Sequence, residues 1–194
     1  MFRFSALIDI CRRDVSRFRG KFVAALCAIA AVVLPSCVTD EVKEPWSVGP
    51  GDECPRFDIV LDDGSRVSTV DLAGRRTMIV FFNTECEDCR RELPVIQSVA
   101  DRLGPETAGE TPQAPGIPYI ICVSRAEGSA AVEEYWAANG LTLPYSAQDD
   151  DAVYRRFASS VIPRVYMIGA DLRIAAAYAE RLPSTDELLR QMGQ

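Results

Sequence analysis

Residues 78–94 read M-I-V-F-F-N-T-E-C-E-D-C-R-R-E-L-P. It opens with a continuous apolar run, Met78–Phe82, which is typical of a short strand buried on both faces. The turn and cap residues N-T-E end that run. Cys86 and Cys89 follow where a helical pattern begins, with apolar positions at Leu93, Ile96 and Val99. Buried strand, turn, Cys-x-x-Cys and helix, in this order, predict redox chemistry at a helix N-terminus.

Two cysteines at this spacing can close a small disulfide ring, and the helix dipole with its free N–H groups favours a thiolate. Cys86 stands first at the helix end, so we expect it to be the nucleophile, with Cys89 as the resolving thiol. Glu87 and Asp88 lie between them, and their charges oppose thiolate formation, which favours a pair that acts as a reductant. Glu92 follows Cys89 by one helical turn and is placed to take the proton that the resolving thiol must lose.

The run C-E-D-C-R-R-E-L-P, preceded by F-F-N-T-E, resembles the exported thioredoxin-like thiol–disulfide oxidoreductases of the TlpA/ResA type, within the Redoxin-related part of the thioredoxin superfamily. Gly51–Arg75 is similar to the N-terminal hairpin of that family, and Val161–Ile168 is similar to its cis-proline strand. The resemblance implies an α/β thioredoxin-like fold over residues 51–194, with a central mixed β-sheet flanked by helices and an N-terminal β-hairpin. The family usually has Trp before the first cysteine, where this chain has Glu85.

The resemblance also implies roles for residues outside the Cys-x-x-Cys motif. Pro163 is expected in the cis form, facing the two cysteines. Ile162, just before it, is expected to offer backbone hydrogen bonds to an extended substrate. In such proteins an acid at the place of Glu92 lies beside the cysteines and tunes their acidity. No cofactor is expected.

The first 36 residues have the features of an export signal. Six Lys and Arg residues precede an uncharged, mostly aliphatic run, Phe22–Leu34, which suits a signal peptide and is short for a spanning helix. The run ends in L-P-S-C, which resembles a lipobox with Ser36 before the cleaved bond and Cys37 as the lipid-bearing residue. An uncleaved signal-anchor helix is the alternative. Either way the domain is predicted to be exported and tethered to a membrane.

Residues 37–50 form the expected tether between this signal and the domain. They carry Asp40, Glu41 and Glu44, an acidic patch similar to export signals of surface lipoproteins in Bacteroidetes-type bacteria, so the outer membrane is favoured for a protein that faces the periplasm or the cell surface. A plain solvated linker is the other interpretation. Residues 37–194 carry 15 Lys and Arg against 26 Asp and Glu, a net charge of −11, which argues against a nucleic-acid partner. We expect a monomer.

The chain contains no histidine, which excludes Ser-His-Asp and Cys-His catalysis and His-ligated metal sites. A structural disulfide and half of a zinc site are alternatives for the Cys-x-x-Cys pair. Zinc needs four ligands, and only Cys54 and Cys122 remain in the exported part, at unsuitable spacing, so no metal is expected. Cys122 lies in an apolar run, which predicts a buried inert thiol, and a second disulfide between it and Cys54 stays open.

Periodicity predicts the remaining elements. The turn D-D-G-S predicts a hairpin of Phe57–Leu61 with Arg66–Val70. Further strands are predicted at Tyr119–Val123, Arg164–Ile168 and Leu172–Ala177. Helices are predicted at Ser129–Asn139, capped by Ser129; at Asp149–Phe157; and at Ser184–Met192, with a capping box from Ser184 to Glu187.

These features predict a thiol–disulfide oxidoreductase that reduces disulfides in exported proteins and is recharged by a membrane electron donor. A peroxiredoxin-like peroxidase is the second hypothesis, although the peroxidase pattern has Thr three residues before the reactive cysteine, where this chain has Asn83. The third hypothesis is a lipoprotein that keeps the fold to bind a partner and uses the disulfide structurally. The intact Cys-x-x-Cys, Glu92 and Pro163 together argue against it.

Overall fold

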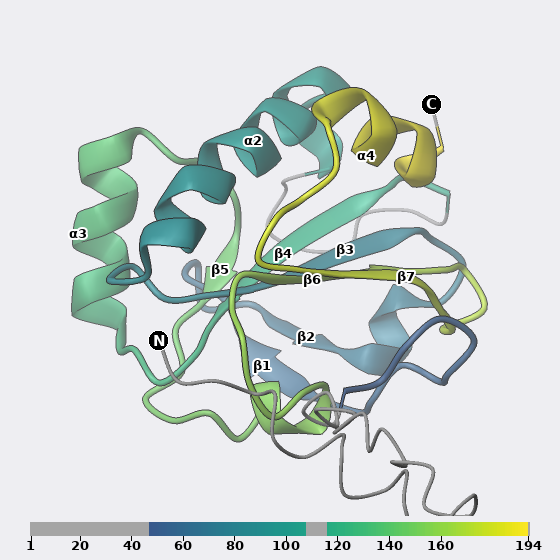
Figure 1. Ribbon diagram of the computed structural model, residues 1–194, viewed down its shortest axis with the longest axis horizontal. Helices are drawn as coiled ribbons and strands as arrows, with labels where there is room; N and C mark the ends of the chain where they lie inside the picture. Colours follow the sequence, from purple (N-terminus) through teal and green to yellow (C-terminus); the bar gives the residue numbers. More distant parts are fainter. Residues whose placement is uncertain (1–46, 108–115, 194) are drawn as a thin grey trace, which may run out of the picture. The chain divides into compact units, whose positions relative to one another are not determined.

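The computed structural model describes residues 47–107 and 116–193, which contain a five-stranded mixed sheet (Figure 1). Its strands are β3 (Thr77–Phe82), β4 (Tyr119–Ser124), β5 (Tyr145–Ser146), β6 (Arg164–Ile168) and β7 (Ile174–Ala179). Their order is β5-β4-β3-β6-β7, with β3 parallel to β4 and antiparallel to β6. The apolar run that predicts a doubly buried strand therefore forms the centre of the sheet, and every residue of β3 is buried.

Three helices cover one face of this sheet: α2 (Glu87–Leu103), α3 (Ser129–Asn139) and α4 (Thr185–Met192) (Figure 1). Alternate β3 residues, Met78, Val80 and Phe82, share a core with the apolar sides of these helices. Within it Phe82 packs against the Trp136 ring of α3 at a centroid distance of 4.8 Å. The helix periodicity predicted for α2 brings Leu93 and its apolar neighbours into the same core.

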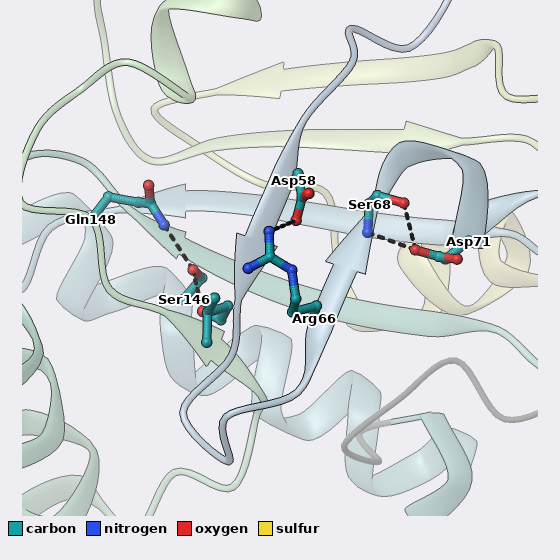
Figure 2. Close-up of polar contacts among 7 residues, drawn as sticks. Asp58, Arg66, Ser68, Asp71, Ser146 and Gln148 are labelled. Carbon is teal, nitrogen blue, oxygen red and sulfur yellow. Dashed lines mark hydrogen bonds and ion pairs between the residues drawn. The ribbon is translucent and has the colours of Figure 1, made fainter.

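The predicted hairpin covers the opposite face as a separate two-stranded sheet of β1 (Asp58–Val60) and β2 (Arg66–Ser68). Figure 2 shows Arg66 pairing with Asp58 across the two strands, with a distance of 2.9 Å from Nη2 to Oδ1. The Ser146 hydroxyl of β5 donates to the Val60 carbonyl at 2.6 Å, which fastens the hairpin to the main sheet. Ile59 and its apolar neighbours then bury the second face of β3.

The structure corrects several sequence-based boundaries. Asp149–Phe157 is not a helix; only a 3₁₀ turn, η3 (Tyr154–Arg156), forms there. The Asp150 carboxylate accepts the Ala152 N–H at 2.8 Å, and such local side-chain bonds compete with helix formation. The predicted Leu172–Ala177 strand begins only at Ile174, because Leu172 turns with a φ of 61°.

The two predicted helix caps have different outcomes. Ser184 does begin α4, since its hydroxyl accepts the Glu187 N–H at 3.4 Å, whereas the Glu187 carboxylate is bonded to Arg190. The cap expected at Ser129 is wrong, because Gly128 precedes α3 in that position and supplies no side-chain bond. Strand β5 has only two residues, too few for a sequence pattern to reveal.

The signal segment, the expected lipid-bearing Cys37 and the tether up to residue 46 lie outside the described residues. Ser47 and Val48, the next residues of the expected tether, pair with the folded part, since the Val48 N–H donates to the Phe157 carbonyl at 2.8 Å. The chain therefore joins the domain slightly before residue 51. Within 47–107 and 116–193, none of the helices has the length and apolar character needed to cross a bilayer.

Candidate redox site

The two motif cysteines lie where β3 ends and α2 begins. Cys86 occupies the N-cap position of α2, and its sulfur accepts the backbone N–H of Cys89 at 3.4 Å. The Cys86 thiol is half-buried and points its S–H toward the Ile162 carbonyl, with a sulfur–oxygen distance of 3.6 Å. Both cysteines are free thiols in the structure. Cys86 is the more accessible of the two residues, since Cys89 is buried.

Cys89 has a very different environment from Cys86, because it is fully buried in the core of the helix face. Burial raises the pKa of the Cys89 thiol strongly, the adjacent Cys86 thiol raises it further, and a backbone hydrogen bond with Asn83 offsets part of the rise. Cys89 is therefore a neutral thiol that needs a proton acceptor before it can act as a nucleophile.

Glu92 is also buried, with only 6% of its surface exposed, so it is not the ordinary surface glutamate that its helix position alone allows. Its carboxylate pairs with Arg91 Nε at 3.2 Å, and Arg91 also reaches Asp88 at 2.7 Å. A carboxylate on this helix, one turn after Cys89 and shielded from solvent, is suited to exchange a proton inside the site.

The strand register brings the cis-proline loop to the cysteines. Arg164 of β6 pairs with Phe81 of β3, so Ile162 and Pro163, which precede Arg164, lie beside the end of β3. The Ile162–Pro163 bond is cis, as the resemblance implies. Ile162 packs against the cores on both faces of the sheet. The topology thus brings the turn after β3, the start of α2 and the cis-proline loop together at one end of the sheet.

Two groups of supporting residues carry no signal in the sequence. The hydroxyl of Tyr154 lies within hydrogen-bond distance of the carbonyls of Ser160 and Val161, just before the cis bond. Thr84, two residues before Cys86, donates from its N–H and hydroxyl to the buried carboxylate of Glu127. Glu127 follows a buried strand and precedes a helix, and this position is the only sequence pattern that could have indicated a functional role for it.

This arrangement defines a class of protein: a thioredoxin-like fold with Cys-x-x-Cys at a helix N-terminus, facing a cis-proline loop. The comparisons with known proteins agree. Residues 49–191 match the Redoxin family model, and the chain belongs to the Redoxin family. The thiol–disulfide oxidoreductase ResA of Bacillus subtilis (strain 168) is 23% identical over 155 residues, covering 80% of this chain and 79% of that protein.

Solved structures show the same fold. A thiol:disulfide interchange protein of the thioredoxin family from Chlorobium tepidum TLS has a TM-score of 0.59 at 20% identity, covering 76% of this chain and 97% of that one. StoA from Bacillus subtilis has a TM-score of 0.58 at 19% identity, covering 72% and 98%. The predicted thioredoxin-like fold and the resemblance to ResA are confirmed, and the protein is a thiol–disulfide oxidoreductase.

Proposed function

We propose that Cys86 and Cys89 are the redox pair and that they reduce disulfides in exported proteins. The observation that carries this proposal is the contrast between the two sulfurs. The half-exposed Cys86 sulfur receives the Cys89 N–H at 3.4 Å at the N-terminus of α2, where the helix dipole favours negative charge. Cys89, directly beneath, is buried and protonated. Cys86 is placed to attack a client disulfide, and Cys89 is placed to resolve the mixed disulfide in the second step.

The reaction balances as a two-electron exchange. The Cys86 thiolate attacks one sulfur of the client disulfide; that S–S bond breaks, and the other client sulfur leaves as a thiolate that takes up a proton. Cys89 then loses its proton and attacks the Cys86 sulfur, which forms the Cys86–Cys89 disulfide and releases the second client thiol. The client disulfide becomes a dithiol while the enzyme dithiol becomes a disulfide.

The neighbouring residues assist these two steps. Glu92, buried one helical turn after Cys89, accepts the proton that Cys89 gives up before its attack. Half-buried Ile162, with buried Pro163 behind it, is the surface along which an extended client chain lies, and the Ile162 carbonyl is 3.6 Å from the Cys86 sulfur. Glu85, which directly precedes Cys86 and stands in place of the Trp usual for the family, is exposed.

We place the enzyme outside the cytoplasm, as a monomer anchored through lipid on Cys37 and facing the periplasm or the cell surface, with the outer membrane favoured. The basic segment, the apolar run and the sequence L-P-S-C support this placement. A membrane electron donor would return the Cys86–Cys89 disulfide to the dithiol after each turnover. Replacing Cys37 with Ser tests the anchor: we expect loss of fatty-acid labelling and of membrane association.

The central test is a redox titration of the purified protein against dithiol buffers, with alkylation mass shifts reporting the Cys86–Cys89 state. A midpoint near or below about −230 mV supports a reductant, whereas one near about −120 mV indicates a disulfide donor. A pair that never exchanges favours a binding lipoprotein instead. Peroxide consumption by the reduced protein well above the free-thiol background would favour the peroxidase hypothesis.

A further inference from the structure

Thr84 lies two residues before Cys86 and is held from two directions. Its backbone N–H donates to Oε2 of Glu127 at 2.8 Å, and its hydroxyl donates to the other oxygen of the same carboxylate. Its carbonyl accepts from Arg90 Nε of α2 at 2.5 Å. Thr84 and Glu127 are both buried. The N–H, hydroxyl and carbonyl groups of Thr84 are therefore all hydrogen-bonded. One partner, Glu127, lies after β4, and the other, Arg90, lies in α2.

Glu127 is itself fixed to the end of the sheet. Its N–H donates to the Gln148 carbonyl at 2.7 Å, and its own carbonyl accepts the Ser124 hydroxyl at 2.6 Å. Ser124 ends β4 and pairs with Phe82, the last residue of β3, in the parallel register. The carboxylate thus projects from a backbone that is tied to the same sheet end from which the motif turn departs.

The turn itself is short. The Glu85 N–H donates to the Asn83 side-chain oxygen at 2.8 Å, and the Cys86 N–H donates to the Asn83 carbonyl at 3.2 Å. A displacement of Thr84 therefore moves Cys86, whose sulfur must stay near the Cys89 N–H. Hydrogen bonds from N–H and O–H groups to a buried carboxylate are among the stronger ones in proteins, which suits Glu127 to hold this turn.

We propose that Glu127 is a positioning residue of the redox site, which sets the place of the Cys86 sulfur by holding Thr84. This inference rests on the proposed Cys86–Cys89 pair. The side chain of Glu127 bonds to Thr84, so Glu127 acts on Cys86 through the turn. The segment between β4 and α3 thereby contributes to thiol exchange, although it lies about 40 residues from the motif in sequence.

Three variants separate geometry from charge. Glu127→Gln has an oxygen that can accept the Thr84 N–H and an NH₂ group that can donate to the Thr84 hydroxyl. It therefore removes the charge and retains hydrogen bonds to both groups of Thr84. Glu127→Ala removes both bonds. Thr84→Val removes only the hydroxyl bond and keeps the N–H bond. Glu134→Ala, an exposed position of α3, is the matched control for loss of a carboxylate.

The test uses the full-length reduced protein and measures two rates: alkylation of Cys86 by iodoacetamide across a pH series, and reduction of insulin disulfides. Thermal unfolding of each variant shows the temperature range in which it is folded, and rates are compared only there. We expect Glu127→Ala to slow insulin reduction about tenfold and to change the pH profile of Cys86 alkylation. Glu127→Gln should stay within about twofold and Thr84→Val should fall between them.

Equal rates and pH profiles for Glu127→Ala and the wild type would overturn the inference, even if the variant melts earlier. A Glu127→Gln variant as slow as Glu127→Ala would also overturn it, because the rate would then depend on the charge of Glu127 and not on its hydrogen bonds to Thr84. If Glu127→Ala does not fold, an unchanged Thr84→Val decides against the inference. A wild-type pair that never exchanges would instead refute the proposed redox pair, and the inference with it.

Discussion

The described residues hold four free cysteines, two of them inside the apolar cores and two after the end of β3, and these two kinds of surroundings give sulfur different properties. Cys54 and Cys122 lie in the cores on opposite faces of the sheet, so they cannot pair with each other. Burial raises the pKa of Cys54 to about 12 and raises the pKa of Cys122 strongly. Cys86 and Cys89 lie at the end of β3, where a helix N-terminus meets a carbonyl of the cis-proline loop.

Exposure alone does not separate the two kinds of cysteine, because neither Cys89 nor Cys122 is accessible to solvent. The difference lies in what surrounds the sulfur. Cys89 has a second thiol beside it and a buried carboxylate one turn away, whereas Cys122 lies within β4 among apolar side chains. In the mechanism that we propose, this sulfur partner and this carboxylate are what set Cys89 apart from Cys122.

Replacing Cys86, the more accessible member of the proposed pair, should have the greatest effect. We expect Cys86→Ser to lose disulfide reduction down to the background of unassisted thiol exchange, because the attacking sulfur is gone. Cys89→Ser keeps the attack and lacks the second step, so it should accumulate a mixed disulfide with its client, visible on non-reducing gels. Cys122→Ala serves as the matched control and should keep full activity. A Cys86→Ser variant that still turns over would show that the motif is not the redox site.

Alkaline pH tests the buried thiols together. Cys54, Cys89 and Cys122 have raised pKa values in the folded state, whereas an unfolded thiol ionises near 9.0. Their contribution to stability is therefore complete below pH 9 and is lost as the pH rises above it. Each thiol should remove about 1.4 kcal/mol from the free energy of unfolding by pH 10.

The measurement is urea unfolding of the reduced protein at pH 8 and pH 10. The double variant Cys54→Ala, Cys122→Ala should lose about 3 kcal/mol less between these pH values than the wild type, because two of the three thiols no longer titrate. The tyrosines contribute equally to both proteins and cancel in the difference. Equal losses would mean that these two thiols are already accessible to hydroxide in the folded state.

Glu92 distinguishes Cys89 from Cys122, and removing its charge should affect only the second chemical step. We expect Glu92→Gln to form the mixed disulfide at nearly the wild-type rate and to resolve it about a hundredfold more slowly near neutral pH. Rapid mixing with a chromogenic disulfide, followed by acid quenching and mass analysis, measures the two steps separately. Glu134→Gln is the exposed control. If resolution is unimpaired, the Cys89 proton leaves by another path.

The sequence predicts those parts of this site that depend on local patterns. The apolar run of β3, the Cys-x-x-Cys spacing and the periodicity of α2 lie within one short stretch, so the strand, the turn and the helix can be predicted there without the rest of the chain. The hairpin turn and the start of α4 at Ser184 are local in the same sense. The cis-proline loop was expected from the family resemblance, and strand pairing explains how it reaches the cysteines.

Sequence patterns do not predict the supporting residues Glu127 and Tyr154, because their roles depend on contacts between segments that are distant in the sequence. Glu127 meets Thr84 only after β4 has paired with β3, and no spacing in the sequence records that contact. Tyr154 lies in a segment whose acidic start favours a helix, yet the carboxylate of Asp150 bonds locally and leaves only a 3₁₀ turn. Side-chain competition and tertiary pairing decided both cases, and neither follows from periodicity.

The cis-proline loop is a further difference between the redox site and the two core thiols, and it should respond weakly to a single change. Val161 has a φ of 65°, which is unusual for a β-branched residue, and the Tyr154 hydroxyl holds its carbonyl at 2.9 Å. Tyr154→Phe leaves the carbonyls of Ser160 and Val161 without this donor and should cost about 1–2 kcal/mol of stability.

In Tyr154→Phe the cis-proline loop should become less ordered, while Cys86 and Cys89 keep their surroundings. We therefore expect KM for a protein disulfide to rise a few-fold with kcat nearly unchanged. Steady-state reduction of insulin at varied concentration separates the two constants. Tyr166→Phe, whose hydroxyl donates to the Phe157 carbonyl at 3.0 Å, controls for the loss of a buried tyrosine hydroxyl. A fall in kcat alone would place the effect on the thiols and remove the cis-proline loop from client binding.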